Sequence, residues 1–216
     1  MRTAARSVPT RFPIFPLEGA LLLPGGNLPL NIFEPRYLAM VRDAMLTDRV
    51  IGMIQPTEPE RPGRRRAIYR TGCLGGITSF AETEDGRYLI TLTGLCRFDV
   101  TEELAVTTPY RQVLAEFARW HADLAPADPP EDVRPRLLAA TEAYFRRRGI
   151  ETDWDAVRGA PLAALVTSLA MLCPFAATEK QALLEAPDLV QQGELLVTLM
   201  DMDARAAQAS GSPVRH

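Results

Sequence analysis

The sequence predicts an α+β protein in which a mixed, mostly antiparallel β part with one inserted helix is followed by a helical bundle. Ten of the 14 glycines precede Leu95 and none occurs from there to Arg148, so tight turns crowd the first half. Asp85-Gly86 stands between two stretches of alternating polarity, which is typical of a β-hairpin. After Pro130, apolar residues recur at spacings of three and four, as amphipathic helices require.

The stretch from Leu21 to Tyr37 starts with an apolar run that is broken by a turn. Pro24 and Gly25 suit the central positions of a type II turn, because proline fixes φ and glycine accepts a positive φ. The apolar residues that follow, up to Phe33, predict a strand that is partly buried on both faces. Pro29 has no amide donor, so this strand is expected at a sheet edge or a bulge.

A helix is expected to begin directly after this strand. Pro35 suits the first helical position, where a missing N–H costs nothing. Glu34 would then be the N-cap, whereas Asn31 with Glu34 three residues on would make a capping box, and the residues leave both registers open. One stripe of the helix is apolar through about Leu46, and consists of Tyr37, Leu38, Val41, Met45 and Leu46.

Further strands are expected as far as Trp120. Glu84-Asp85-Gly86 joins two of them in a hairpin, and the polar, proline-containing segment Pro56–Arg66 is expected to be a loop. The expected strands are Arg49–Gln55, Thr71–Thr83, Arg87–Thr93 with a continuation through Cys96, Phe98 and Val100, and Tyr110–Trp120.

The segment His121–Pro130 is a break in composition and marks the expected boundary between two parts. Asp128 as N-cap, Pro129 at the first position and Glu131 as capping partner then predict a helix that ends at Gly149. Later helices are expected at about 161–173, 178–185 and 187–205. The expected organisation is a β-rich subdomain at 12–120 and an α-helical subdomain at 128–208, with flexible tails at 1–11 and 209–216.

Composition and motifs exclude several classes of protein. The formal net charge of -3 argues against a general polyanion binder. The single lysine, Lys180, follows Glu179 rather than glycine, which excludes a P-loop, and no serine lies in a Gly-x-Ser-x-Gly elbow. His121 and His216 are the two histidines, too few for a His-assembled metal site or a conventional triad. We therefore expect no catalytic residues, no cofactor and no metal.

Cysteine usage and the ends of the chain indicate a reduced, cytoplasmic compartment. Cys73, Cys96 and Cys173 form an odd set without metal-ligand spacing, and the first two are expected as buried small hydrophobes rather than a redox pair. The first eleven residues contain no apolar core of a secretory signal. The uncharged stretch Ala160–Thr178 is interrupted by Pro174 and is too short to cross a bilayer.

Three carboxylates in the second half are spaced like the first ligands of a calcium loop. These are Glu151, Asp153 and Asp155, but Ala156 stands where the loop needs glycine and Leu162 where it needs a bidentate glutamate. The solvated start of a helix is the favoured interpretation.

Several segments carry a family resemblance. In chain order these are Phe12–Leu17, Leu21–Tyr37, Gly52–Ile54, Gly72–Ile77, Asp85–Tyr88, Leu92–Phe98 and Pro109–Arg111. From Phe12 to about Arg205 the chain resembles the substrate-binding N-terminal domain of the Lon family of ATP-dependent proteases. The resemblance implies that the β part is a pseudo-barrel like the PUA domain. Full Lon proteases carry an ATPase module and a Ser-Lys peptidase after this domain, and this chain ends before either, so a stand-alone, non-enzymatic module is expected.

The resemblance also implies a function and a site. The implied function is recognition of unfolded or extended polypeptide as an adaptor in bacterial protein quality control, with a separate protease or chaperone as partner and without nucleic acid or membrane. Arg36 and Tyr37 are the candidate binding residues, with Arg97 contributing on the strand side, and the edge that contains Pro29 could add backbone hydrogen bonds. The alternative is structural: Tyr37 packs its ring inward and Arg36 pairs with a strand carboxylate such as Glu18. The residues with structural roles are Pro24, Gly25, Glu34, Pro35, Asp85 and Gly86.

Two other functions stay open. An RNA-binding PUA-like module would use Arg64–Arg66, although the run is short, lies near Glu58 and Glu60 and has no interleaved aromatics, which favours a solvated loop. An enzyme acting on a small molecule in a cleft between the two subdomains is disfavoured by the scarcity of histidine and the lack of a paired-carboxylate signature.

Overall fold

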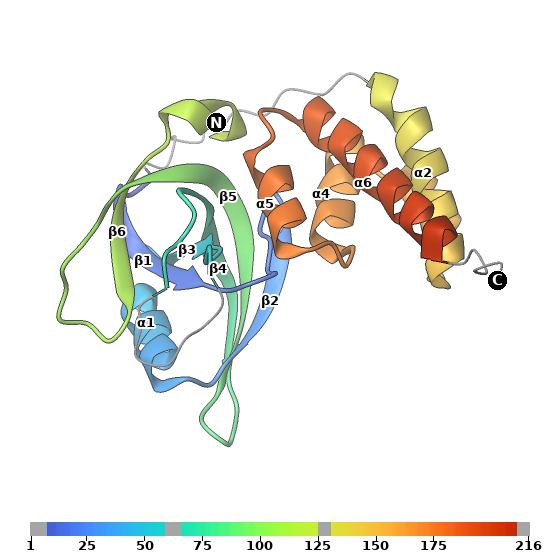
Figure 1. Cartoon of the computed structure of the whole chain (residues 1–216). Coiled ribbons are helices and arrows are strands. Elements are labelled where there is room, and N and C mark those ends of the chain that lie inside the picture. The colour runs from blue at the N-terminus through green and yellow to red at the C-terminus, as the bar shows by residue number, and fades with distance from the viewer. Residues whose placement is uncertain (1–7, 59–65, 125–130, 211–216) are drawn as a thin grey trace, which may run out of the picture. The chain divides into compact units, whose positions relative to one another are not determined.

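The computed structural model describes residues 8–58, 66–124 and 131–210, and the chain divides into two compact units, Met1–Pro126 and Ala127–His216 (Figure 1). The described part of the first unit is mostly strand, and that of the second is helical, which confirms the predicted α+β class. Within the described ranges, none of the helices combines the length and the apolar character that crossing a bilayer requires.

The N-terminal unit is built on a mixed sheet of six strands. Its elements are β1 (Arg11–Pro16), β2 (Asn27–Ile32), α1 (Pro35–Met45), β3 (Val50–Ile54), β4 (Thr71–Glu82), β5 (Tyr88–Glu103), β6 (Arg111–Glu116) and the 3-10 helix η1 (Ala118–Leu124). The strand order is β2-β5-β4-β3-β1-β6, with β1 and β3 parallel and the other pairs antiparallel. Because β6 pairs with β5 as well as with β1, the sheet curls back on itself.

Apolar side chains from the strands fill the inside of this curled sheet. The rings of Phe12 and Phe98 meet edge-on, with centroids 4.9 Å apart and an interplanar angle of 73°. Around them lie Ile14, Val50, Ile54, Leu74, Val113 and Ala115, all buried. Burying one large apolar side chain contributes about 1.5–3 kcal/mol, so this cluster contributes substantially to the stability of the unit.

The turn at Pro24 and Gly25 is confirmed. The Gly26 amide donates to the Leu23 carbonyl at 2.9 Å, and Gly25 has φ +76°, as the third position of a type II turn requires. Gly94 of β5 lies against this turn, because its amide donates to the Gly26 carbonyl at 2.8 Å. A Cβ on Gly94 would stand 2.0 Å from the Leu23 carbonyl oxygen, so only glycine fits there.

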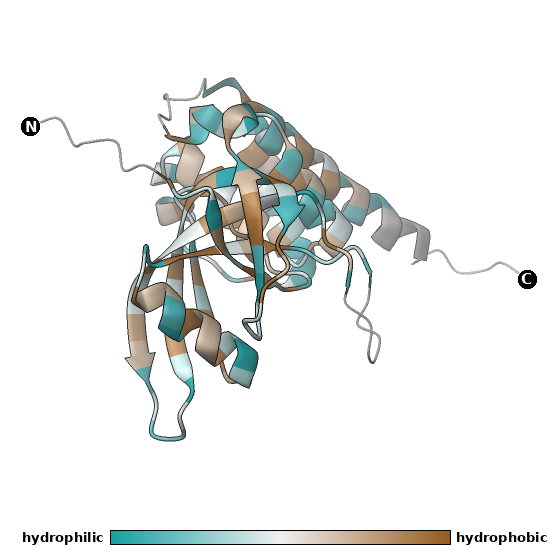
Figure 2. Ribbon diagram, turned by 90° about the vertical axis from the view of Figure 1, so that its left-hand side faces the viewer, coloured by the Kyte–Doolittle hydropathy of each residue, from teal (hydrophilic) through white to brown (hydrophobic). Residues whose placement is uncertain are grey.

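The hairpin between β4 and β5 is also confirmed. The Thr83 amide donates to the Arg87 carbonyl at 2.9 Å, the Gly86 amide donates to the Thr83 carbonyl at 2.9 Å, and Gly86 has φ +79°. Figures 1 and 2 both show the tip of this hairpin projecting beyond the rest of the N-terminal unit, with α1 beside it in Figure 2. Pro29 lies in β2, which is at the end of the strand order, so the predicted edge position is confirmed as well.

Two expectations about the N-terminal unit are wrong in part. The strand expected from Tyr110 to Trp120 ends at Glu116, because the next residues fold into η1 and place Trp120 against β5. The apolar stripe of α1 does not extend to Leu46, which caps the helix C-terminus and is 81% exposed. Periodicity alone cannot tell a stripe residue from a cap.

The C-terminal unit is an assembly of helices. They are the 3-10 turn η2 (Glu131–Val133), α2 (Arg134–Arg148), α3 (Trp154–Gly159), α4 (Leu162–Leu172), α5 (Ala177–Glu185) and α6 (Leu189–Ser210). Its core joins α2, α4 and α6 through Leu137, Tyr144, Val166, Leu196 and Met200. Gly149 ends α2 in the left-handed conformation with φ +65°, as predicted. The predicted N-cap Asp128 and its neighbour Pro129 lie outside the described residues.

The three carboxylates that are spaced like calcium ligands, Glu151, Asp153 and Asp155, lie at the start of α3. Asp153 caps α3, and its Oδ1 accepts from the amides of Asp155 at 3.0 Å and Ala156 at 3.1 Å. Among the residues that the structure describes, no three His, Cys, Asp or Glu side chains come close enough to hold a metal. Cys73 and Cys96 are buried free thiols in β4 and β5, and burial raises the pKa of the Cys96 thiol to about 12.

Candidate polypeptide-binding site

The candidate site lies at the connection between β2 and α1. Glu34 is the N-cap, with extended φ −71° and ψ 133°, and its carbonyl accepts from the amides of Tyr37 and Leu38, each at 2.9 Å. Pro35 stands in the first helical turn, as predicted. The Glu34 side chain makes no capping hydrogen bond, so of the two open registers the chain adopts the first, without a capping box.

The Glu34 carboxylate, which does not cap the helix, instead binds Arg36. The Arg36 Nη2 lies 2.7 Å from Glu34 Oε2, and Nε donates to the same oxygen at 2.9 Å. The two side chains are 45% and 42% exposed, so the pair fixes the guanidinium more than it stabilises the fold. This arrangement differs from the expected pair of Arg36 with Glu18, which instead lies 3.6 Å from Arg66.

Tyr37 contributes its ring to the inside of the unit and its outer face to Arg36. The Tyr37 ring is tilted against Phe15 with centroids 4.2 Å apart, and the residue is 8% exposed. The Arg36 Cζ lies 4.6 Å from the centre of the Tyr37 ring, within cation-π range. The structural alternative is therefore correct for Tyr37, which packs inward while still bordering the surface.

A hollow of about 280 Å³ opens beside this ring pair. Its apolar wall includes Phe15, Leu30, Phe33 and Tyr37, and Arg36 stands at its rim. Phe33 is 63% exposed, which is unusual for a large aromatic side chain. Sequence reasoning missed Phe33 as a surface residue, because an apolar residue at the end of a strand reads as core.

A second hollow, of about 680 Å³, is also lined in part by Arg36. It is lined by Ala105 to Arg111, the connection between β5 and β6, and Arg36 lines both hollows. Arg36 is thus common to both hollows, and we call the two hollows together the Arg36 groove. Apolar side chains alternate with polar and charged ones along the lining, which includes Arg66 in the first hollow and Arg111 in the second.

The far wall of the Arg36 groove is held by polar contacts. The Tyr110 hydroxyl donates to Asp43 Oδ2 at 2.6 Å, and burial together with this hydrogen bond raises the pKa of Tyr110 to about 12. Arg111 grips Glu103 with Nε at 2.5 Å and Nη2 at 2.8 Å, and its Nη1 donates to the Arg66 carbonyl at 2.9 Å. The connection between β5 and β6 is thus tied to both α1 and β5.

Arg97, the third predicted site residue, does not line the Arg36 groove. Its side chain is 6% exposed, and it forks onto Asp123, with Nε to Oδ2 at 2.8 Å and Nη2 to Oδ1 at 2.7 Å. The Arg97 amide also donates to Asp123 Oδ2 at 2.9 Å, and the Arg97 Cζ lies 4.0 Å from the ring centre of Trp120. The structure thus brings Arg36 and Tyr37 together and places Arg97 in the contact between β5 and η1.

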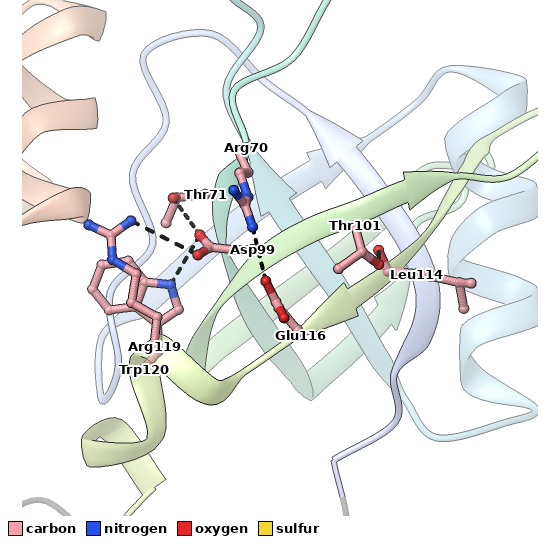
Figure 3. Close-up of polar contacts among 8 residues, drawn as sticks. All are labelled: Arg70, Thr71, Asp99, Thr101, Leu114, Glu116, Arg119 and Trp120. Carbon is pink, nitrogen blue, oxygen red and sulfur yellow. Dashed lines mark hydrogen bonds and ion pairs between the residues drawn. The ribbon is translucent and has the colours of Figure 1, made fainter.

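A second carboxylate completes this contact, as Figure 3 shows. Thr71 donates to Asp99 Oδ1 at 2.7 Å, and the Trp120 indole N–H donates to the same oxygen at 3.2 Å. Arg119 approaches Asp99 Oδ2 at 3.9 Å and has its Cζ 4.3 Å from the centre of the Trp120 ring. Two arginines, two carboxylates and one indole therefore hold η1 against the sheet. No local sequence pattern predicts that network.

The fold combines a curled β-sheet unit with a helical unit, and the Arg36 groove lies on the first of them. The chain belongs to the family described as the ATP-dependent protease La (LON) substrate-binding domain, which matches residues 11–202. The predicted resemblance is therefore confirmed.

Relatives and solved structures agree with this assignment. The chain is 28% identical to "Lon protease 2" of Myxococcus xanthus and to "Lon protease" of Anaeromyxobacter dehalogenans, each over 204 residues and 90% of this chain. It spans 24% and 23% of their lengths, about a quarter. The fold is shared with a Lon N-terminal domain protein from Xanthomonas campestris, with a TM-score of 0.61 and 24% identity over 88% of this chain and 98% of that one. The N-terminal domain of the Lon protease of the Mycobacterium avium complex gives a TM-score of 0.63 at 14% identity, with the same shares covered.

Proposed function

We propose that this chain recognises unfolded or extended polypeptide through the Arg36 groove and presents it as an adaptor to a separate protease or chaperone. The observation that carries the proposal is the pairing of an exposed aromatic ring, Phe33, with a hollow whose wall is made by Phe15 and Tyr37. Folded proteins bury such side chains in their cores, whereas unfolded chains expose them. Selectivity for the unfolded state follows from that difference.

Arg36 contributes one of the charged groups of the groove. Because its guanidinium is already matched by Glu34, the rim is close to neutral and does not select strongly by charge. Membership in a substrate-binding family supports the same class of ligand. The ligand proposed is therefore an apolar segment of polypeptide rather than an acidic or a basic one.

The test is a fluorescence anisotropy titration with reduced, carboxymethylated α-lactalbumin, a permanently unfolded protein. Wild type is expected to bind in the micromolar range, and Phe33→Ser is expected to bind at least fivefold more weakly, because an apolar contact of about 1–3 kcal/mol is lost. Leu172→Ser is the matched control, since Leu172 is 81% exposed and lies in the C-terminal unit. Equal weakening by the two substitutions, or equal binding of native α-lactalbumin, would contradict the proposal.

The alternative function, RNA binding, is distinguished from polypeptide binding by the salt dependence of the affinity. Arg66 is 3.6 Å from Glu18, and Arg64 and Arg65 lie outside the described residues. RNA binding through such a run predicts an affinity that falls steeply with salt concentration, whereas the apolar groove predicts a nearly flat response. A single-stranded RNA of twenty nucleotides, titrated at 50 and 200 mM NaCl, distinguishes the two.

A further inference from the structure

The outer half of β4 is paired on one side. The register of β3 with β4 runs from Met53↔Cys73 to Val50↔Gly76 and ends there. The pairing of β4 with β5 continues to Glu82↔Tyr88, at the tip of the hairpin. The described part of the N-terminal unit thus pairs Thr78–Glu82 with β5 alone, and all five residues of this segment are exposed. We call Thr78–Glu82 the β4 edge.

The register identifies which backbone groups point outward from the β4 edge. Thr83 and Arg87 form a hydrogen-bonded pair, because the Thr83 amide donates to the Arg87 carbonyl. Hydrogen-bonded and non-hydrogen-bonded pairs alternate along antiparallel strands, so Glu82 and Phe80, opposite Tyr88 and Ile90, are non-hydrogen-bonded. Their N–H and C=O groups therefore point away from β5, about 6.8 Å apart along the strand.

At this end of the sheet, the strands are β4, β5 and β2, and the outer edge of β2 is poorly suited to pairing with a further strand. β2 pairs with β5 and is the other outer strand at this end of the sheet, but it carries Pro29, which has no N–H to offer. The β4 edge contains no proline, and its bulge lies at the inner end, between Ile77 and Ser79. Sheet edges that lack such protection pair readily with another extended chain.

Side chains on the β4 edge define what that chain carries. Phe80 is 41% exposed and stacks on Tyr88, with ring centroids 5.0 Å apart. Glu82 follows on the same face of the strand, two residues on. A residue paired with Phe80 would thus meet an apolar surface, and one paired with Glu82 would meet a carboxylate.

The charge at the hairpin tip points the same way. Its acidic residues are Glu82, Glu84 and Asp85, and Asp85 is paired with Arg87 at 2.9 Å. From the helix side, Arg42 of α1 interacts with Tyr88 and, more weakly, with Glu82, and both interactions raise the pKa of Arg42. Three carboxylates against two guanidiniums leave a net negative tip, which complements a basic side chain.

We propose that the β4 edge accepts one strand of an extended polypeptide by β-augmentation, with an apolar residue opposite Phe80 and a basic residue two positions away opposite Glu82. Main-chain hydrogen bonds to Phe80 and Glu82 hold the strand, and the two side chains select it. The proposal rests on the proposed function, since both require a polypeptide client, but it assigns a different surface and a different type of bond from the Arg36 groove.

The test uses a fluorescein-labelled peptide, acetyl-Thr-Arg-Thr-Val-Thr-Arg-Thr-amide, and the full chain. The peptide reads the same in both directions, so either strand orientation places valine opposite Phe80 and an arginine opposite Glu82. We expect micromolar to submillimolar binding and slowed hydrogen exchange of the Phe80 and Glu82 amides in the complex. The peptide N-methylated at its five inner residues should bind at least tenfold more weakly, because antiparallel pairing uses the valine and arginine amides and parallel pairing uses the threonine amides between them. Glu82→Lys should weaken binding at least fivefold, whereas Glu102→Lys, the same change at another exposed position of the sheet, should not.

The outcomes separate the two proposals. Equal binding of the methylated peptide, or unchanged exchange at Phe80 and Glu82, would overturn strand addition and leave the Arg36 groove untouched. Failure of the peptide to bind while carboxymethylated α-lactalbumin binds through Phe33 would do the same. A concentration-dependent dimer that Glu82→Lys dissociates would assign the β4 edge to a second copy of this chain and would also overturn the proposal.

Discussion

Removing the Asp123 carboxylate should destabilise the N-terminal unit severely. Asp123 is 8% exposed at its side chain and accepts three hydrogen bonds from Arg97, whose side chain is 6% exposed. In Asp123→Ala the buried guanidinium loses these three hydrogen bonds and the opposite charge without gaining solvent, a change that costs about 3–5 kcal/mol. Since domains of this size have about 5–15 kcal/mol of stability in total, we expect a large shift of the unfolding transition.

The assay is urea unfolding followed by the fluorescence of Trp120. The chain has two tryptophans, so a Trp154→Phe background leaves Trp120 as the single reporter of the N-terminal unit. Glu116→Ala is the matched control, because it breaks an exposed pair with Arg70 whose side chains are 66% and 48% exposed. Exposed pairs contribute about 0–1 kcal/mol.

A double substitution shows whether the loss comes from the stranded charge. Arg97→Met combined with Asp123→Leu replaces the pair by apolar side chains, which is often neutral or stabilising for buried pairs. We expect it to recover most of the stability lost in Asp123→Ala. A loss of about 1 kcal/mol or less in Asp123→Ala, no larger than that in Glu116→Ala, would refute the reasoning.

Two further predictions concern packing and ionisation. Gly94→Ala drives a Cβ against the Leu23 carbonyl and should lower the unfolding free energy by at least about 1–3 kcal/mol in a urea titration. Gly76→Ala is the control, because the atoms nearest to its Cβ would lie 3.6 Å away, and it should change the unfolding free energy little. Equal effects of the two substitutions would contradict the close approach of Gly94 to Leu23. Burial and Asp43 raise the pKa of Tyr110 to about 12, above the usual value of about 10, so the stability that Tyr110 contributes is fully present below pH 10 and is lost as the pH rises through 12. Phenolate absorbance should show this late titration, and Asp43→Asn should move it to lower pH; an identical titration curve in Asp43→Asn would show that the hydrogen bond has no such effect.

Local chemistry explains which parts of the fold could be predicted from the sequence. The turn at Pro24 and Gly25 and the hairpin at Gly86 were predictable because each depends on the φ values of a few neighbouring residues. The start of α1 at Pro35 follows from the same kind of local constraint. Such signals act within about four residues, so they report turns and caps rather than contacts.

The contact between β5 and η1 could not be predicted in that way. Arg97 and Asp123 are 26 positions apart, and nothing near Arg97 indicates that a carboxylate will reach it. An arginine in a strand is ordinarily solvated, and Arg97 was expected on the strand side of the binding groove. Burial of the pair depends on η1. The sequence pattern instead predicted that the preceding strand continues through the first residues of η1, as far as Trp120.

The candidate site was predictable in part. Arg36 and Tyr37 were predicted from the stretch that carries the family resemblance, and in the structure both line the first hollow of the Arg36 groove. Phe33 was missed, because periodicity reports whether a residue is apolar and not whether another element covers it. The β4 edge was missed for a related reason: a strand pattern does not say where the neighbouring strand stops.

The most direct test of the central claim, polypeptide recognition at the Arg36 groove, is the ratio of dissociation constants of Phe33→Ser and Leu172→Ser for carboxymethylated α-lactalbumin. The two substitutions remove exposed apolar side chains of similar size, one at the groove and one in the C-terminal unit. The groove predicts that Phe33→Ser binds at least fivefold more weakly than Leu172→Ser. A ratio of one, or tighter binding by Phe33→Ser, would contradict it.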